Sequence, residues 1–372
     1  MFTIEMLPAN SGDALWIEYG EPGDIHRILV DGGTAGTAEL LGPRLAERAD
    51  AGEPLELMVV SHVDCDHIEG IRKLFDDGQP PVPFKELWFN NYGHLPGTDE
   101  PEGPGGFGTF GPKHGELLTD RLEALGLESK WNAEFGSKDP VVVPDSGALH
   151  VVELDGGMKL TVLSPGLEQL EKLKPFWEKE CAAAGISLGL RFDETLELPP
   201  APATFGDEVL PDVEALANTA GDTDDRQANG SSIALLAEYG GRRALLAADA
   251  HPDVLAAGIE RVPGFDGKLT VDVFKLPHHG SDANVTTDLL NLVECDRYLI
   301  STKGHGGHDH PGKAAMSRVI VHGRSAAKPT PHLVFNYHTD LTKVWEADEL
   351  QDEHDYTAEY PATSDGGIVI EV

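Results

Sequence analysis

An apolar strand that runs directly into a cluster of metal-ligand residues constrains this chain more than any other feature. Leu57–Val60 predicts a buried strand, and the seven residues after it read SHVDCDH. Four of them can hold a metal, namely His62, Asp64, Asp66 and His67. Just past the end of a strand, the side chains of two residues that are two positions apart can point to the same side. The start of a helix directs the side chains of the next two residues inward. Such donors suit Zn²⁺, Mn²⁺ or iron; the alternative is an acidic helix cap at Asp66 with His62 on the surface.

Short apolar segments alternate with longer ones along the chain, and the short ones are bounded by Gly, Pro or Asp. We expect strands at Phe2–Met6, Ala14–Tyr19, Arg27–Asp31, Glu56–Ser61, Glu86–Phe89, Leu149–Leu154, Lys159–Leu163, Ser232–Tyr239, Arg242–Ala247, Val271–Leu276, Arg297–Ser301, His332–Tyr337, Lys343–Glu346 and Gly367–Glu371. We expect helices at Thr37–Ala49, His67–Phe75, His114–Leu125, Leu167–Ala184, Pro252–Ile259, Val285–Leu292 and Lys313–Val321. This mixture predicts an α/β protein with two β-sheets and helices outside them, rather than a purely parallel sheet.

Two irregular stretches interrupt this alternation. Pro96–Pro112 is dense in Gly and Pro, and Arg191–Asp225 is acidic and contains proline. We interpret residues 1–372 as one elaborated domain, with loop or lid insertions around 90–113 and 165–228. We expect both insertions to lie over one end of the fold, bordering the metal site.

The charge of the chain limits its partners. Asp and Glu number 64 against 28 Lys and Arg, a formal charge of −36, so the surface as a whole repels duplex nucleic acid and anionic lipid. The three cysteines are scattered, which fits a reducing compartment, and no basic leader or long apolar run is present. We therefore expect a cytoplasmic protein with no membrane contact; a protein partner is left open.

Several motifs together resemble a known superfamily. The segment SHVDCDHIEG resembles the metallo-β-lactamase signature His-x-His-x-Asp-His, with Asp64 in place of the second His, a variant of the ComEC-like branch. Further similar motifs follow in order: NSGDA at 10–14, VDGG at 30–33, NGSSI at 229–233, LLAAD at 245–249, LPHHGS at 276–281 and, after Ile300-Ser301, His310-Pro311. The resemblance covers about residues 2–320. It implies an αββα four-layer sandwich with insertions.

The resemblance implies a role for each matched residue. His62 and Asp64 would hold one divalent ion, Asp66 and His67 a second, and Asp249 would bridge the two; the simpler alternative for Asp249 is a helix cap. The implied cofactors are two ions of zinc or manganese. A water held between two such ions loses a proton near neutral pH and is the expected nucleophile, with Asp66 and Asp249 beside it.

The tandem His278 and His279 should place at least one imidazole in the site, as a ligand or as a donor to a substrate oxyanion. We assign His278 to the metal and His279 to catalysis, although the sequence does not decide which one points inward. His310 is a further candidate ligand, because it precedes proline as the family pattern requires. The alternative is that the GHGGHDH run at 304–310 is a separate metal-binding loop.

One departure from the family pattern alters the expected metal. Many members carry a ligand His ahead of the strand that begins here at Ser232, and this chain has none there. Asp222, Asp225 or Asn229 could replace it, or the first ion is under-coordinated, or only one ion binds. An oxygen-richer site shifts the preference from Zn²⁺ towards Mn²⁺ or another hard ion.

The substrate side of the site is less defined. Tyr92 and His94 follow a strand end on the expected site side, and Ser281 completes the HHGS motif; we expect these three to contact substrate.

Three functions fit these residues. The first is a metal-dependent phosphodiesterase acting on a small or short nucleotide or another phosphodiester, up to a nuclease, although Lys275, Lys303, Lys313 and Arg318 form no basic run. The second is a lactone, ester or amide hydrolase of the same fold. The third is a metal-binding scaffold or partner protein that has lost turnover.

Overall fold

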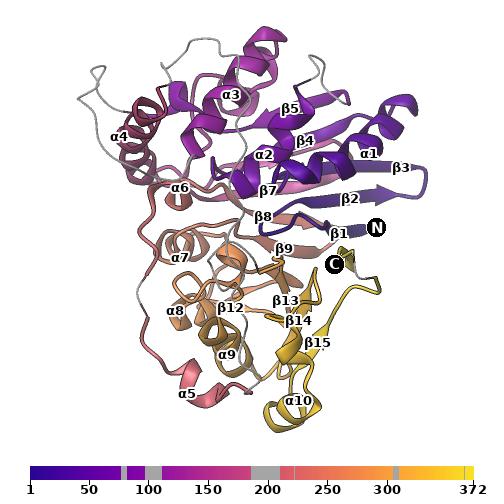
Figure 1. Ribbon diagram of the computed structural model, residues 1–372, viewed down its shortest axis with the longest axis vertical. Helices are drawn as coiled ribbons and strands as arrows, with labels where there is room; N and C mark the ends of the chain where they lie inside the picture. Colours follow the sequence, from indigo (N-terminus) through magenta and orange to yellow (C-terminus); the bar gives the residue numbers. More distant parts are fainter. Residues whose placement is uncertain (77–81, 97–110, 186–209, 222, 305–309, 364) are drawn as a thin grey trace.

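Strands near the N-terminus carry apolar side chains on both faces, so they need cover on both sides. In β3 (Asp24–Val30), Ile28 and Val30 belong to the large apolar core that both sheets share, whereas Leu29 belongs to a second core against helices. Two sheets therefore lie face to face with helices outside, in the order α, β, β, α (Figure 1). The predicted four-layer α/β sandwich is confirmed.

The computed structural model describes residues 1–76, 82–96, 111–185, 210–221, 223–304, 310–363 and 365–372. The first sheet has antiparallel strands on one side and parallel strands on the other, in the order β16 (Ile368–Glu371), β1 (Phe2–Met6), β2 (Leu15–Glu21), β3, β4 (Leu55–Val59), β5 (Phe84–Trp88). The last strand thus pairs with the first, and the two termini lie side by side (Figure 1).

The second sheet is also mixed. Its order is β15 (Thr357–Glu359), β14 (His332–Phe335), β13 (Arg297–Ile300), β11 (Val273–Lys275), β9 (Arg242–Leu246), β8 (Ala234–Tyr239), β7 (Lys159–Ser164), β6 (Val151–Glu153). The strands from β15 to β9 are parallel, and those from β9 to β6 are antiparallel. A two-stranded ribbon, β10 (Leu269–Thr270) with β12 (Val293–Glu294), lies beside them.

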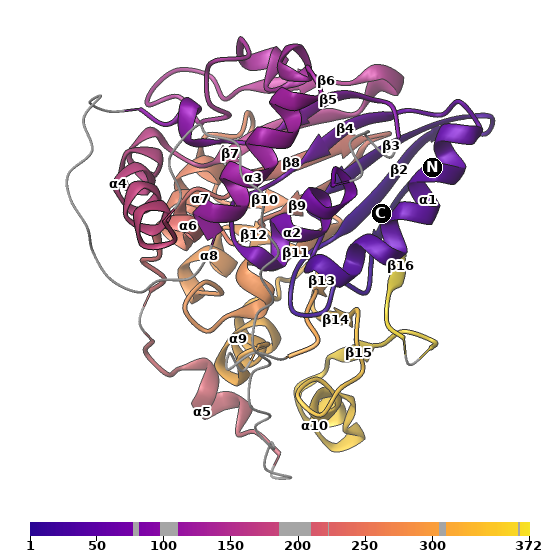
Figure 2. The same cartoon turned by 45° about the horizontal axis from the view of Figure 1, so that its top comes forward.

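Helices cover both outer faces, as Figure 2 shows from a second side. Against the first sheet pack α1 (Ala38–Asp50), α2 (Cys65–Leu74), α3 (Gly111–Ala124) and α4 (Leu167–Ala183). Against the second pack α7 (Pro252–Glu260), α8 (Thr287–Asn291) and α9 (Lys313–His322). The remaining helices are α5 (Val213–Ala217), α6 (Gln227–Gly230) and α10 (Asp348–His354). Among the described residues, no helix is long and apolar enough to cross a membrane.

One predicted strand is wrong, and several short elements of the described structure were not predicted, namely α5, α6, α10, β10, β12 and β15. The strand predicted at Lys343–Glu346 is wrong, because these residues form a 3₁₀ turn that buries Trp345 completely. The apolar pair Val344 and Trp345 between two charged residues resembled a short strand. The sequence reading also missed β15, whose three residues are half-buried or exposed and carry no apolar pattern.

The described parts of the two expected insertions are largely helical. Residues 165–228 contain α4, α5 and α6, and α5 packs against α9. Residues 97–110, 186–209 and 222, which include most of the Gly/Pro-rich stretch, lie outside the described residues. Residues 223–228 do reach the metal-ligand cluster described below, through Asp224 and Arg226.

A close backbone approach fixes the start of α2 against the first sheet. The amide of Asp13 donates to the carbonyl of Asp66 at 3.2 Å. A Cβ at Gly12 would lie 1.6 Å from that same carbonyl oxygen, so only glycine fits there. The loop after β1 therefore positions the first turn of α2, which carries part of the site.

Candidate metal centre

The site is built at the carboxyl ends of neighbouring strands. His62 follows β4 in the first sheet, Asp249 follows β9 in the second, and His278 and His279 follow β11. Strands β9 and β11 are parallel neighbours, so the residues after them meet at one edge of the sheet. Because the two sheets face each other, both sets of strand ends meet between them.

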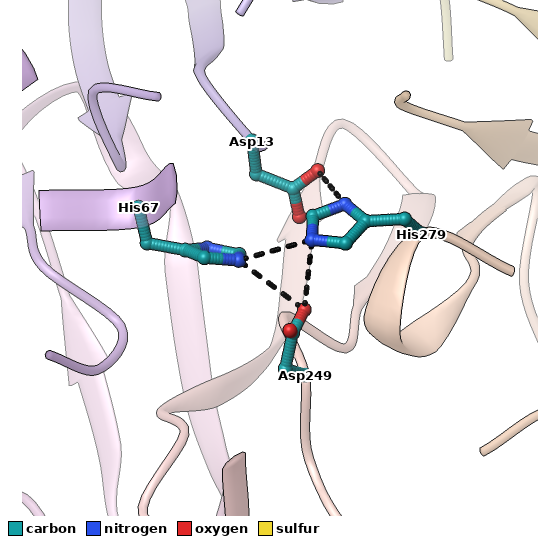
Figure 3. Close-up of side chains that lie close together, drawn as sticks. All are labelled: Asp13, His67, Asp249 and His279. Carbon is teal, nitrogen blue, oxygen red and sulfur yellow. Dashed lines mark hydrogen bonds and ion pairs between the residues drawn. The ribbon is translucent and has the colours of Figure 1, made fainter. Parts of the chain in front are cut away.

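The carboxylate of Asp249 lies between two pairs of histidines. Its Oδ2 is 3.9 Å from His62 Nε2 and 3.7 Å from His278 Nε2. Its Oδ1 is 3.4 Å from His67 Nε2 and 3.6 Å from His279 Nε2. Figure 3 shows His67, His279 and Asp249 pointing toward one another, with Asp13 beside the His279 ring. One carboxylate therefore faces two separate groups of nitrogen donors.

The imidazole of His67 is held from behind by Asp31. Asp31 Oδ2 lies 2.9 Å from His67 Nδ1 and also accepts from the hydroxyl of Ser61 at 2.7 Å. That hydroxyl lies 3.0 Å from His62 Nδ1. In this arrangement the Nδ1 side of each ring faces outward and the Nε2 atom faces Asp249. Such outer partners fix the tautomer of metal-binding histidines.

The tandem histidines are oriented in the same way. His278 Nδ1 lies 2.8 Å from Asn284 Oδ1, and His279 Nδ1 lies 2.9 Å from the carbonyl oxygen of Ser301. A carbonyl or amide oxygen can only accept, so each Nδ1 donates to its partner and each Nε2 faces the centre. Both histidines therefore point into the site, a question that the sequence left open.

Strained backbone accompanies this geometry. Asp31, Ala248, His278 and His279 all have positive φ, between 47° and 61°. Non-glycine residues in this region cost roughly 1–3 kcal/mol each and are held there by surrounding structure, often at functional sites. The left-handed turn at His278-His279 directs two consecutive imidazoles into the same space.

Two carboxylates at the start of α2 complete the cluster. Asp64 Oδ2 is 3.9 Å from His62 Nε2, and Asp66 Oδ2 is 3.5 Å from His279 Nε2. Asp64 occupies the N-cap position without capping the helix through its side chain. Burial, with Asp66 and Asp249 nearby, raises the pKa of Asp64 to about 7. A simple helix cap therefore does not explain these two residues.

The cluster has the electrostatics of a cation site. Burial and the neighbouring His67 lower the pKa of His62 to about 3. Burial alone would lower the pKa of His279, but Asp249 and Asp13 raise it to about 10. His62 Nε2, Asp64 Oδ1 and Asp249 Oδ1 are buried and make no hydrogen bond within the described chain. Buried nitrogen and oxygen donors without partners fit a divalent ion.

A buried ion pair supports His279 from outside. Lys275 is fully buried, and its Nζ lies 2.5 Å from Asp13 Oδ2. Asp13 Oδ1 in turn lies 3.3 Å from His279 Nδ1. Burial would raise the pKa of Asp13, yet Lys275 and His279 hold it well below its usual range. One carboxylate oxygen of Asp13 also lies within 4.8 Å of a possible metal-ligand atom of each of His67, Asp249 and His279. Asp13 belongs to the NSGDA motif at 10–14, but no role was predicted for it.

Polar residues from the segment ahead of Ser232 surround His278. Asp224 Oδ2 lies 3.3 Å from His278 Nδ1 and accepts from Asn229 Nδ2 at 2.6 Å. Of the replacements considered from the sequence, Asp225 is exposed, and Asp222 lies outside the described residues. Asp224, which the sequence reading did not single out, is the acidic residue that contacts His278.

The other expected site residues divide into near and distant ones. The His310 ring lies beside His278, with ring centroids 4.8 Å apart, so it borders the cluster. Ser281 stabilises the turn after the histidines, accepting from the amide of Ala283 at 3.2 Å. His305 and His308 lie outside the described residues.

Tyr92 and His94 are held by other parts of the fold. The hydroxyl of Tyr92 donates to Glu178 of α4 at 2.6 Å. His94 is buried, with Nδ1 accepting from the Asn91 amide at 3.3 Å and Nε2 3.3 Å from the carbonyl of Ser137. These contacts give His94 a structural explanation, so its substrate role stays a prediction.

A pocket of about 420 Å³ opens beside Asp224. Its lining is mostly acidic or polar: Glu168, Gln169, Lys172, Thr223, Asp224, Asp225, Gln227, Gly230, His251 and Asp253. A small molecule fits this volume, whereas a long polyanion would meet mainly carboxylates.

Replacing Asp31 by alanine is expected to weaken metal binding about 10–100-fold, because His67 loses the partner that fixes its tautomer. Competition with a chromophoric chelator measures the affinity. Asp50, an exposed residue at the end of α1, provides the control Asp50→Ala. Equal affinities for Asp31→Ala and the unsubstituted protein would remove the orienting role of Asp31.

Comparisons with known proteins add little beyond this geometry. No protein-family model matches the sequence, and no curated protein matches it. Among solved structures, the chain is similar to CmlA, a diiron β-hydroxylase from Streptomyces venezuelae, with 11% identity and a TM-score of 0.38, over all of this chain and 54% of that one. A mutant form of CmlA gives 12% identity, the same TM-score and the same coverage. The chain thus spans about half the length of these proteins.

Proposed function

We propose that the chain is a metal-dependent hydrolase of the metallo-β-lactamase superfamily, in its ComEC-like branch, that cleaves a phosphodiester in a small molecule or short nucleotide. One observation carries this proposal: Asp249 directs one oxygen toward His62 and His278 and the other toward His67 and His279. That is the placement expected of a carboxylate that bridges two divalent ions, zinc or manganese.

The residues divide into two ligand groups. His62, His278 and Asp64 would hold one ion, and His67, His279 and Asp66 the other, with Asp249 shared. Bound there, the two ions would polarise a phosphoryl oxygen and activate a water as nucleophile. The four imidazoles are buried, so bulk water is excluded from around them. Each Nδ1 atom contacts a partner on the side of the ring away from Asp249, which fixes the orientation of the ring.

Arg226 gives the site a positive group for an anionic substrate. Its side chain is 47% exposed, and its Nη2 lies 3.0 Å from His278 Nε2. Two other cations near the motifs are committed to the fold: Lys275 to Asp13, and Arg318 to the carbonyl oxygens of Asp282 and Val285. Arg226 Nε lies 3.4 Å from Asp224 Oδ1. With His278 Nε2 engaged by an ion, Arg226 Nη2 would be left to bind one phosphate oxygen.

The surroundings favour a small substrate over a polynucleotide. The pocket beside Asp224 is lined by Glu168, Asp225 and Asp253 as well as Lys172, and the chain carries a formal charge of −36. Successive phosphates of a long strand would be repelled by these carboxylates. The same acidic lining supports the second candidate, hydrolysis of a neutral lactone, ester or amide.

Activity panels distinguish these two functions. Protein reconstituted with Zn²⁺ or Mn²⁺ should hydrolyse bis-p-nitrophenyl phosphate and short or cyclic nucleotides faster than lactones or β-lactams. Arg226→Met should lower kcat/KM for the phosphodiester about 10–100-fold, the value of a lost charge-assisted hydrogen bond. It should leave hydrolysis of a neutral ester unchanged.

The matched control is Arg242→Met, which removes an exposed guanidinium at the start of β9, the end of the strand remote from Asp249. Rapid lactone or β-lactam hydrolysis without phosphodiester cleavage would contradict the phosphodiesterase proposal and favour the second candidate.

A further inference from the structure

A second group of metal-ligand residues lies on another face of α2. Cys65, Glu69 and His114 each offer one donor atom, and these three atoms lie within 4.8 Å of one another. Cys65 is flanked in sequence by Asp64 and Asp66, yet it groups with different residues from theirs. This second group supplies sulfur, oxygen and nitrogen, whereas the cluster around Asp249 supplies only nitrogen and oxygen.

Helix geometry brings the three residues together. Cys65 and Glu69 are four residues apart in α2, so their side chains share one face of the helix. His114 comes from the first turns of α3, which packs against α2. Its Nε2 lies 3.4 Å from Glu69 Oε1. Two donors on one tetrahedral zinc ion, each about 2.1 Å from it, are also about 3.4 Å apart.

His114 and Glu69 are both constrained in this position. His114 is 8% exposed, and its Nδ1 is buried and makes no hydrogen bond to any described residue. Glu69 Oε2 accepts from the amide of Ala35 at 3.2 Å, which leaves Oε1 directed at His114. An outer hydrogen bond of this kind orients a ligating carboxylate.

The local charge is compatible with a divalent cation. A thiolate at Cys65 and the Glu69 carboxylate would together neutralise it. Arg72 of the same helix is paired with Asp76 at 3.2 Å. Burial, Arg72 and the buried Lys113 lower the pKa of His114 to about 3, which keeps its imidazole neutral and able to bind a cation. Thiolate, imidazole and carboxylate donors select zinc over hard ions such as Mn²⁺ or Mg²⁺.

We propose that Cys65, Glu69 and His114 form a separate zinc site, with water in the fourth position, that fastens α3 to α2. This site lies outside the cluster around Asp249 and is independent of the proposed hydrolase activity. Because α2 also carries Asp66 and His67, the zinc would brace the helix on which part of that cluster depends.

Cobalt substitution tests this site directly. Protein stripped of metal and titrated with Co²⁺ should develop a sulfur-to-cobalt charge-transfer absorption in the near ultraviolet, reaching one equivalent per chain. The cluster around Asp249 contains no sulfur and contributes only weak visible bands. Cys65→Ser should abolish the charge-transfer band, and His114→Gln should weaken cobalt binding at this site at least tenfold. Zinc content should fall by one ion per chain in both variants.

Two controls separate this proposal from the hydrolase. Cys295→Ser should retain the band, because Cys295 donates to the carbonyl of Arg297 and serine can replace that bond. Asp249→Ala should also retain it while the other ions are lost. A titration without a charge-transfer band, or a band that survives in Cys65→Ser, would overturn the zinc site whatever the fate of the hydrolase. Unchanged zinc content in Cys65→Ser and His114→Gln would overturn it equally.

Discussion

Asp249→Ala is expected to abolish binding of the two divalent ions at this cluster. The rate of hydrolysis should fall about 10³-fold or more, which corresponds to a barrier raised by roughly 4 kcal/mol. The reason is geometric: both oxygens of this carboxylate face histidine pairs, and no other described side chain stands between the pairs in this way. The fold should persist, because Asp249 follows the end of β9 and its side chain faces the ligand cluster rather than the apolar core.

Asp249→Asn keeps the shape of the aspartate side chain and one of its oxygens, but removes the negative charge. We expect it to bind no more than one ion per chain at this cluster and to retain little activity. The control Asp266→Asn changes an exposed residue between α7 and β10 and should leave metal content unchanged. Metal analysis and circular dichroism together check the result. A folded Asp249→Ala protein with full activity would refute the bridging role.

Lys275→Met is expected to destabilise the protein by about 3–5 kcal/mol, the cost of leaving one member of a buried ion pair uncompensated. Lys275 and Asp13 are both almost completely buried, and their charged atoms lie 2.5 Å apart. Chemical denaturation measures the free energy of unfolding. The exposed Lys159, on β7, gives the control Lys159→Met, which should change stability by less than about 0.5 kcal/mol.

The double variant Lys275→Met/Asp13→Asn tests the pairing itself. Removing both charges should lower the free energy of unfolding by less than the sum of the two single changes, because neither charge is then left buried without a partner. Additive effects would show that the two side chains are not coupled.

Acid stability gives the same pair a pH signature. The pKa of Asp13 is depressed in the folded protein below its ordinary value of 3.8. Its carboxylate therefore contributes stability at pH values above about 4, and this contribution is lost as the pH falls through the lower folded-state pKa. Without Lys275 the pKa of Asp13 should rise, so acid unfolding of Lys275→Met should begin at a higher pH.

Local sequence was sufficient for much of the fold. The segments from Leu55 to Leu74 could be predicted because an apolar strand, a polar turn and an amphipathic helix follow one another without interruption. The same was true of the strand ends at Asp249 and His278, where polar residues follow apolar runs. Such patterns depend only on residues that are close in the sequence, so a single sequence is enough to detect them.

The supporting residues could not be found in this way. Asp13 lies in the loop between β1 and β2 of the first sheet, whereas Lys275 ends β11 of the second, and only the packing of the two sheets brings them together. Lys275 did carry a signal, since a lysine inside an apolar strand requires a buried partner, but the sequence does not say which acid that is. Asp224 was hidden among Asp222 and Asp225, and local spacing cannot decide which of these reaches His278.

Anomalous diffraction from crystals grown with Zn²⁺ or Mn²⁺ tests the central claim most directly, because it locates each ion and counts it. At the cluster around Asp249 we predict two peaks about 3.5–4 Å apart, one beside His62 and His278 and the other beside His67 and His279, with Asp249 between them. A further zinc peak at Cys65, Glu69 and His114 belongs to the separate site and does not bear on this test. A crystal saturated with either metal that shows no peak beside Asp249, or no second peak among these four histidines, would contradict the two-ion centre.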